Sequence, residues 1–184
     1  MEEYLDVVDM KGNPTGEIVE RKKAHAQGIW HRTSHVWLVR KREGEIEVLV
    51  QKRSADKDSY PGCYDTSSAG HIPAGSTYEE SAIRELKEEL GINAEISELH
   101  TCGMRTIYHD EIFYGKMFID RQISKVFYII RDLEEKEFTI QKEELESIRW
   151  MKLSDCIDMV KYHEPKNCIA MEELEVLKSG LGLE

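Results

Sequence analysis

Three glutamates in one short segment have the spacing of a metal site. Glu85, Glu88 and Glu89 stand at positions i, i+3 and i+4, so in a helix their side chains project from one face. Carboxylates this close repel one another, and a hard divalent cation with oxygen ligands would offset the repulsion. A solvent-exposed acidic helix face has the same pattern and is common. The three residues alone therefore leave both interpretations open.

The flanking residues predict the helix that would position these carboxylates. Thr77 followed by Glu80 forms an N-terminal capping box, and Gly91 stands where helices often end in the left-handed conformation. Between these signals an apolar stripe recurs at helical spacing and must face a core; it consists of Ile83, Leu86 and Leu90. We therefore expect a helix over residues 77–90.

A longer pattern surrounds the three glutamates. Its fixed positions are Gly70, Arg84, Glu85, Leu86, Glu88, Glu89, Gly91 and Ile92. This segment, residues 70–92, resembles the Nudix box: Gly, five residues, Glu, seven residues, then Arg-Glu-aliphatic-x-Glu-Glu-x-Gly-aliphatic. The one departure is Ser76, which stands where the pattern has its first Glu. A match of this length is far more specific than a three-residue motif.

The resemblance implies a fold and an activity. The fold is of the α/β class (α+β type), a Nudix-like mixed β-sheet between helices. The activity is hydrolysis of a diphosphate bond in a small molecule, such as a nucleoside diphosphate linked to another group, with Mg²⁺ or Mn²⁺ as the cofactor. The metal ligands would be Glu85, Glu88 and Glu89, with the carbonyl of Gly70, and Arg84 would orient the carboxylates. Because Ser76 removes the usual partner of this arginine, we expect Arg84 to pair with Glu80 instead.

The segment before the box points to one branch of this superfamily. Residues 53–66 and the following Ala69-Gly70-His71 are similar to isopentenyl diphosphate isomerase, an enzyme with the same fold that is not a hydrolase. This resemblance implies that Arg53 and Lys57 bind the substrate diphosphate. A solvated loop is the alternative for either residue taken alone.

Histidines extend the similarity to the isomerase. That enzyme uses three histidines for a metal, and His25, His31 and His71 fall near the corresponding places. Ordinary polar or capping roles are the alternative for each, because ligand spacing this long is unspecific.

Two departures speak against isomerase chemistry. The isomerase needs a Cys before the Gly-His and a Glu on a later strand, where this chain has Ala69 and Gln122. Neither side chain can titrate, and proton addition and removal at carbon needs an acid and a base. We therefore expect an isomerase-related hydrolase. The alternatives are an isomerase-type enzyme and a diphosphate-binding module with weakened catalysis.

A general base and a substrate-stacking residue are harder to assign. Late glutamates at 143, 144 and 146 could supply a base or metal ligand, although a charged surface turn would have the same sequence pattern. The tryptophans at 30, 37 and 150 could stack on a substrate base, but aromatic residues at strand positions more often belong to the core.

The remaining elements are read from turn residues and apolar patterns. A β-hairpin is expected from Tyr4–Asp9 and Glu17–Val19, and a strand pair from His35–Arg40 and Ile46–Gln51. Further strands are expected at 114–118, 125–130 and 147–151, and helices at 154–162 and 165–178. Strands and helices without regular alternation favour a mixed sheet with helices packed on it. We expect a single domain over residues 1–184, with residues 1–30 as an N-terminal hairpin extension.

Composition limits the partners. The 184 residues carry a formal net charge of −11, which opposes nucleic-acid binding through a broad basic surface. No apolar run approaches membrane-spanning length, and the first residues lack a signal-peptide pattern. The four cysteines are scattered, which favours free thiols in a reducing cytoplasm. A homodimer is left open by the sequence.

Overall fold

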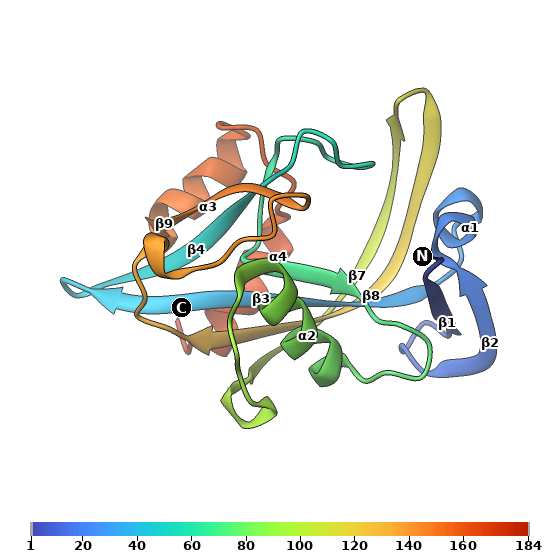
Figure 1. Cartoon of the computed structure of the whole chain (residues 1–184), viewed down its shortest axis with the longest axis horizontal. Helices are drawn as coiled ribbons and strands as arrows, with labels where there is room; N and C mark the ends of the chain where they lie inside the picture. The colour runs from blue at the N-terminus through green and yellow to red at the C-terminus, as the bar shows by residue number, and fades with distance from the viewer. Residues whose placement is uncertain (1, 184) are drawn as a thin grey trace.

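The computed structural model describes residues 2–183 and consists of a mixed sheet flanked by helices (Figure 1). The strands are β1 (Tyr4–Val8), β2 (Pro14–Glu20), β3 (His31–Arg42), β4 (Glu45–Arg53), β5 (Tyr64–Asp65), β6 (Ser68–His71), β7 (His100–Phe113), β8 (Lys116–Ile130) and β9 (Leu145–Lys152). The helices are α1 (Arg21–Gln27), α2 (Tyr78–Leu90), α3 (Leu153–Tyr162) and α4 (Met171–Gly180). None of the helices within this range is long and apolar enough to cross a membrane.

The main sheet has seven strands, with β5-β4-β3-β8-β7 in sequence across it, β6 paired to β3 and β9 paired to β4. The pairing of β3 with β8 is parallel, whereas the other pairs are antiparallel. This mixed sheet between helices confirms the predicted fold class.

Alternation along β3 divides the core into two layers. Val36 and Leu38 pack with the apolar stripe of α2, while Trp37 and Val39 pack with residues of α3 and α4. Successive side chains of a strand point to opposite faces, so β3 serves as the central wall between the two clusters. Toward its N-terminal end the same strand carries polar side chains, which leave the core and reach the site described below.

The N-terminal hairpin is present and is fastened to the box loop. Strands β1 and β2 pair antiparallel, as predicted. Leu5 forms an isolated bridge with Pro73, and the Ala74 amide donates to the Tyr4 carbonyl at 2.9 Å. The hairpin therefore contributes to the position of residues 73–76, which lead into α2.

Several expected boundaries differ from the structure. The strand expected at 125–130 and residues 116–118 of the strand expected at 114–118 belong to the single long strand β8, whereas residues 114 and 115 form the preceding turn. The partner strand β7 was not expected at all. Most of β7 is an edge strand with exposed side chains, so it lacks the apolar alternation that marks a strand. The helix expected at 165–178 begins only at Met171, and α1 was also missed.

Candidate active site

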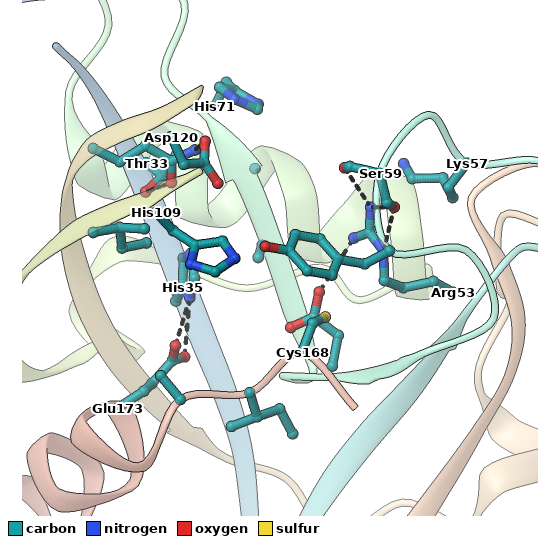
Figure 2. Close-up of a pocket in the computed structure, with 18 of the residues that line it drawn as sticks. Thr33, His35, Arg53, Lys57, Ser59, His71, His109, Asp120, Cys168 and Glu173 are labelled. Carbon is teal, nitrogen blue, oxygen red and sulfur yellow. Dashed lines mark hydrogen bonds and ion pairs between the residues drawn. The ribbon is translucent and has the colours of Figure 1, made fainter. Parts of the chain in front are cut away.

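A cleft of about 870 Å³ lies where α2 and β6 meet the loop after β4 and the β7–β8 hairpin. Figure 2 shows part of its lining, with His35, His71, Asp120 and Arg53 contributed by separate segments of the chain. All three glutamates of the box line this cleft. Helix α2 begins and ends as predicted, with the Thr77–Glu80 capping box and Gly91 in the left-handed conformation.

Two of the glutamates are fixed against β6. Glu89 is only 6% exposed, and its Oε2 accepts from the Ser68 hydroxyl at 2.7 Å and from the Ala69 amide at 3.3 Å. Glu85 lies so close to Gly70 that any Cβ at this glycine would come within 3.0 Å of the carboxylate. The box glycine and the box helix are therefore in direct contact, as a shared metal site would require.

Burial raises the pKa of two of these carboxylates. Burial, together with the charge of Glu85, raises the pKa of Glu89 to about 8. Burial also raises the pKa of Glu85 to about 7, against the opposing effect of Arg84. A cation among the three carboxylates would favour their charged forms, and hard divalent ions take such oxygen ligands. The donor set thus fits Mg²⁺ or Mn²⁺.

Arg84 does not use the partner we expected. Its guanidinium donates to Glu85 at 2.5 Å and to the His71 carbonyl at 3.1 Å, while its buried Nε has no partner within residues 2–183. The expected pairing with Glu80 is wrong, because the Glu80 carboxylate is occupied by the backbone and hydroxyl of Thr77. Ser76 contributes its carbonyl, which accepts from Arg32 at 2.9 Å.

The two predicted phosphate-binding residues also line the cleft. Arg53 holds its own loop together by donating to the Ser59 carbonyl at 2.9 Å and to Asp65 at 3.2 Å (Figure 2). Lys57 forms an ion pair with Glu144, and burial lowers the pKa of the lysine. Of the late glutamates, only Glu144 is among the residues that line the cleft.

The three histidines converge near β6, where His71 lines the cleft and His25 and His31 are buried behind it. One nitrogen from each of His25, His31 and His71 lies within 4.8 Å of the others. The Ile29 carbonyl accepts from Nδ1 of His31 at 2.8 Å, which leaves Nε2 of that ring without a hydrogen-bond partner in the described chain. Burial lowers the pKa of His31 to about 4 and the pKa of His71 well below its usual value.

A neutral imidazole with a free lone pair, as at His31 Nε2, is suited to a transition metal. Nε2 of His25 and Nε2 of His71 lie 2.9 Å apart and share a hydrogen bond. Asp120 Oδ1 lies 3.1 Å from His25 Nδ1 and adds a carboxylate beside the cluster. The resemblance had grouped His25 with the other two histidines, but the helix that positions it, α1, was not predicted.

The residues that departed from the isomerase pattern also face the cleft, whereas the tryptophans do not. Ala69 and Gln122 are part of its lining, and Gln122 accepts from the Thr33 hydroxyl at 3.2 Å and donates to Asp120 at 2.7 Å. Trp37 is fully buried in the core. None of the three tryptophans belongs to the cleft lining.

Sequence reasoning missed a polar group on the cleft floor. Glu173, in the first turn of α4, is 2% exposed and accepts from His35 at 2.9 Å, Trp37 at 3.1 Å and Arg105 at 2.7 Å. The available signal was the alternation of β3, which puts His31, Thr33 and His35 on one face. The partners on β7 and α4 gave no such signal.

Comparison with known proteins agrees with the box and the sheet. The family model described as NUDIX domain matches residues 29–170. An uncharacterized Nudix hydrolase of Clostridium acetobutylicum is 41% identical over 145 residues, which cover 78% of this chain and 67% of that protein. Nudix hydrolase 3 of Arabidopsis thaliana is 36% identical over 94% of this chain, but the match covers only 21% of the plant protein. An isopentenyl-diphosphate Delta-isomerase of Cereibacter sphaeroides is 28% identical, with 79% of this chain and 76% of the isomerase covered.

Solved structures share the fold at low sequence identity. A Deinococcus radiodurans protein superposes with a TM-score of 0.67 at 19% identity, covering 96% of this chain and 99% of that one. A Caenorhabditis elegans Ap4A hydrolase in a binary complex gives a TM-score of 0.56 at 21% identity, covering 82% of this chain and 97% of the hydrolase. At these identities the similarity establishes the architecture only.

Proposed function

This chain belongs to the Nudix hydrolase family, and from that membership we propose that it uses a divalent metal to cleave the diphosphate bond of a small molecule. The substrate class is a nucleoside diphosphate linked to another group, or a similar diphosphate. The observation that carries the proposal is the convergence of Glu85, Glu88 and Glu89 on the cleft, with Glu85 packed against Gly70.

Each charged residue at the fixed positions of the box has a task in this proposal. Glu85, Glu88 and Glu89 would hold Mg²⁺ or Mn²⁺, with the carbonyl of Gly70 as a further ligand. When bound, the metal would neutralise phosphate charge and favour attack by water at phosphorus. Arg84 orients Glu85 through their 2.5 Å contact.

The loop after β4 would bind the phosphates. Lys57 lines the cleft and is the residue that can reach a diphosphate once Glu144 releases it. Arg53 donates hydrogen bonds to Ser59 and Asp65, and it supports binding by fixing that loop. Glu144, freed from Lys57, would be left as a carboxylate close to the substrate.

A substrate screen with one matched variant tests the proposal. Purified protein is incubated with Mg²⁺ or Mn²⁺ and ADP-ribose, a nucleotide sugar, diadenosine tetraphosphate, a coenzyme diphosphate or a prenyl diphosphate. We expect metal-dependent release of a phosphate-containing product from at least one of these. Glu89→Gln should lower kcat by roughly 10²–10³-fold and leave the circular dichroism spectrum unchanged. Wild-type turnover by this variant would refute the assignment.

The histidine cluster supports a second candidate, an isomerase-type enzyme acting on an allylic diphosphate. Three buried imidazoles within 4.8 Å are a metal site of a different kind from the box. Against this candidate, Ala69 and Gln122 occupy the cleft where an acid and a base would be needed. We expect no deuterium to enter isopentenyl diphosphate in heavy water at saturating metal. Incorporation above a no-enzyme control would favour the isomerase.

A further inference from the structure

A histidine–carboxylate pair on the cleft floor has no task in the box chemistry. His35 lies on β3 and lines the cleft. Its Nδ1 lies 2.9 and 3.0 Å from the two carboxylate oxygens of Glu173 (Figure 2). Its Nε2 makes no hydrogen bond within residues 2–183 and is accessible to solvent. The ring is therefore fixed at one nitrogen and free at the other.

The negative charge on Glu173 determines which tautomer His35 adopts. Although burial opposes it, hydrogen bonds from His35 and Trp37 and the charge of Arg105 lower the pKa of Glu173, so the carboxylate is ionised at neutral pH. An ionised carboxylate can only accept hydrogen bonds, so Nδ1 of His35 carries the hydrogen. In the neutral ring Nε2 then holds the lone pair, the arrangement in which a carboxylate orients a histidine base.

The register of the sheet places this ring beside the box. His35 pairs directly with Ala69 on β6, and directly opposed side chains share a face with Cβ atoms roughly 4.5–5.5 Å apart. The amide of Ala69 donates to Glu89. Residue 69 carries only a methyl group, so its side chain takes little space beside the imidazole.

From this geometry we infer that His35 is the general base of the proposed hydrolysis, and that Glu173 is its positioning residue. Nε2 takes a proton from water as the water oxygen forms its bond to phosphorus. The bond from phosphorus to the bridging oxygen breaks, and the electron pair stays on the leaving phosphate, which takes a proton from solvent. The imidazolium then returns its proton to solvent. This inference rests on the proposed function.

The surroundings suit this task. The titratable and charged groups packed around His35 are Glu173 on α4, Arg105 on β7 and His71 on β6. Glu173 favours the charged imidazole that forms in the reaction, whereas the guanidinium of Arg105 opposes it.

The test uses the substrate of the panel that wild type hydrolyses fastest. His35→Gln should lower kcat by about 10²–10³-fold, with KM within about threefold, and should abolish the loss of rate at acid pH that marks a base. Glu173→Gln, which can still accept from the neighbouring donors, should lower kcat by about 10-fold and move that acid limb to lower pH. His100→Gln is the matched control, because His100 stacks on Tyr128 outside the cleft lining; it should behave as wild type.

Chemical rescue separates catalysis from a purely structural link between β3 and α4. In His35→Ala, free imidazole should restore at least tenfold of the lost rate, since the cleft of about 870 Å³ admits it. Wild-type kcat in His35→Gln, or a loss that imidazole does not rescue and that follows a fall in Tm, would overturn the inference while the metal-dependent reaction stands. If wild type hydrolyses none of the panel, the proposed function itself fails and this inference fails with it.

Discussion

At the scale of single residues, the missing side chain at Gly70 determines how Glu85 reaches β6. A Cβ there would lie within 3.0 Å of three atoms of the Glu85 side chain. Gly70 does not have a positive φ, so space, not backbone conformation, requires glycine at this position. Any larger residue must displace a carboxylate of the box.

Gly70→Ala should therefore destabilise the protein through Glu85. Overpacking of this kind costs typically about 1–3 kcal/mol, and the displaced carboxylate should also bind metal more weakly. The free energy of unfolding, measured by urea titration, gives the cost. The matched background is Glu85→Ala, in which the added methyl has room and the cost of Gly70→Ala should largely disappear. An equal cost in both backgrounds would contradict the argument.

Ser76 stands where the box pattern has a glutamate, so at this position a carboxylate is missing. Arg84 Nε is buried without a partner within the described residues, and Glu80 is occupied by Thr77. Ser76→Glu should supply the partner and raise kcat/KM several-fold. A carboxylate before the helix should also be tolerated, because the helix dipole favours it by roughly 0.3–1 kcal/mol. Ser76→Gln is the neutral control; an equal or lower rate in Ser76→Glu than in wild type would mean that the site works without this partner.

These residues show where sequence reasoning reaches its limit. The shared face of Glu85, Glu88 and Glu89 follows from helical periodicity and the capping box, and α2 forms as predicted. The partner of Arg84 did not follow, because two carboxylates compete for it and local geometry decides. The contact between Glu173 and His35 joins residues 138 positions apart, and no local pattern encodes such a pair.

At the scale of elements, the N-terminal hairpin acts as a brace for the box loop. Asp6 on β1 accepts from Arg32 at 2.8 Å and from the Gly75 amide at 2.9 Å, and Arg32 also donates to the Ser76 carbonyl. The Asp6 and Arg32 side chains are 14% and 8% exposed. A mostly buried ion pair thus ties β1, β3 and the loop before α2 together.

Removing one partner of this pair should loosen the loop. Asp6→Ala leaves the Arg32 charge buried without its carboxylate, which costs typically about 3–5 kcal/mol. Hydrogen exchange at the Gly75 amide should accelerate together with the loss of stability. Glu17→Gln, an exposed acidic position on β2, removes the same charge and should change stability by less than about 0.5 kcal/mol. A similar effect of both variants would show that net charge, not the brace, was responsible.

The elements that were not predicted from the sequence lie where exposed residues or polar cleft-lining residues interrupt the apolar pattern. Within β8, four of the five residues from Asp120 to Ser124 are polar although buried, the exception being Ile123, because part of this segment lines the cleft. Because of that polar stretch, the sequence predicted two separate strands where the structure has the single strand β8. The hairpin, the β3–β4 pair and α2 were confirmed because their turns, caps and apolar spacing all agree with one structure.

At the scale of the whole molecule, the cleft collects residues from nearly the full length of the chain, from Glu3 before β1 to Glu173 on α4. Negative charge dominates, with a formal net charge of −11. A bound cation in the cleft should thus act on the stability of the entire fold as well as on the reaction.

The response to metal should depend on pH in a defined direction. Glu85 and Glu89 have folded pKa values of about 7 and 8, raised from an ordinary value of 4.5. The metal-free folded state therefore binds more protons than the unfolded chain between about pH 4.5 and 8, and its stability contribution from these groups falls as pH rises through that window. Metal requires the deprotonated carboxylates, so it should stabilise the protein most at the alkaline end.

Thermal unfolding with and without Mn²⁺ at pH 5.5 and pH 8.5 measures this response. Metal at about 100 times its Kd adds about 2.7 kcal/mol, and each kcal/mol raises Tm by roughly 2–4 °C in a chain of this size. We expect an increase in Tm of about 5–10 °C at pH 8.5 and less than half of that at pH 5.5. In Glu89→Gln one deprotonation is no longer required, so the difference between the two pH values should shrink. Equal increases at both pH values in wild type would show that metal binds away from these buried carboxylates, and the histidine cluster would then be the site to test by replacing His31.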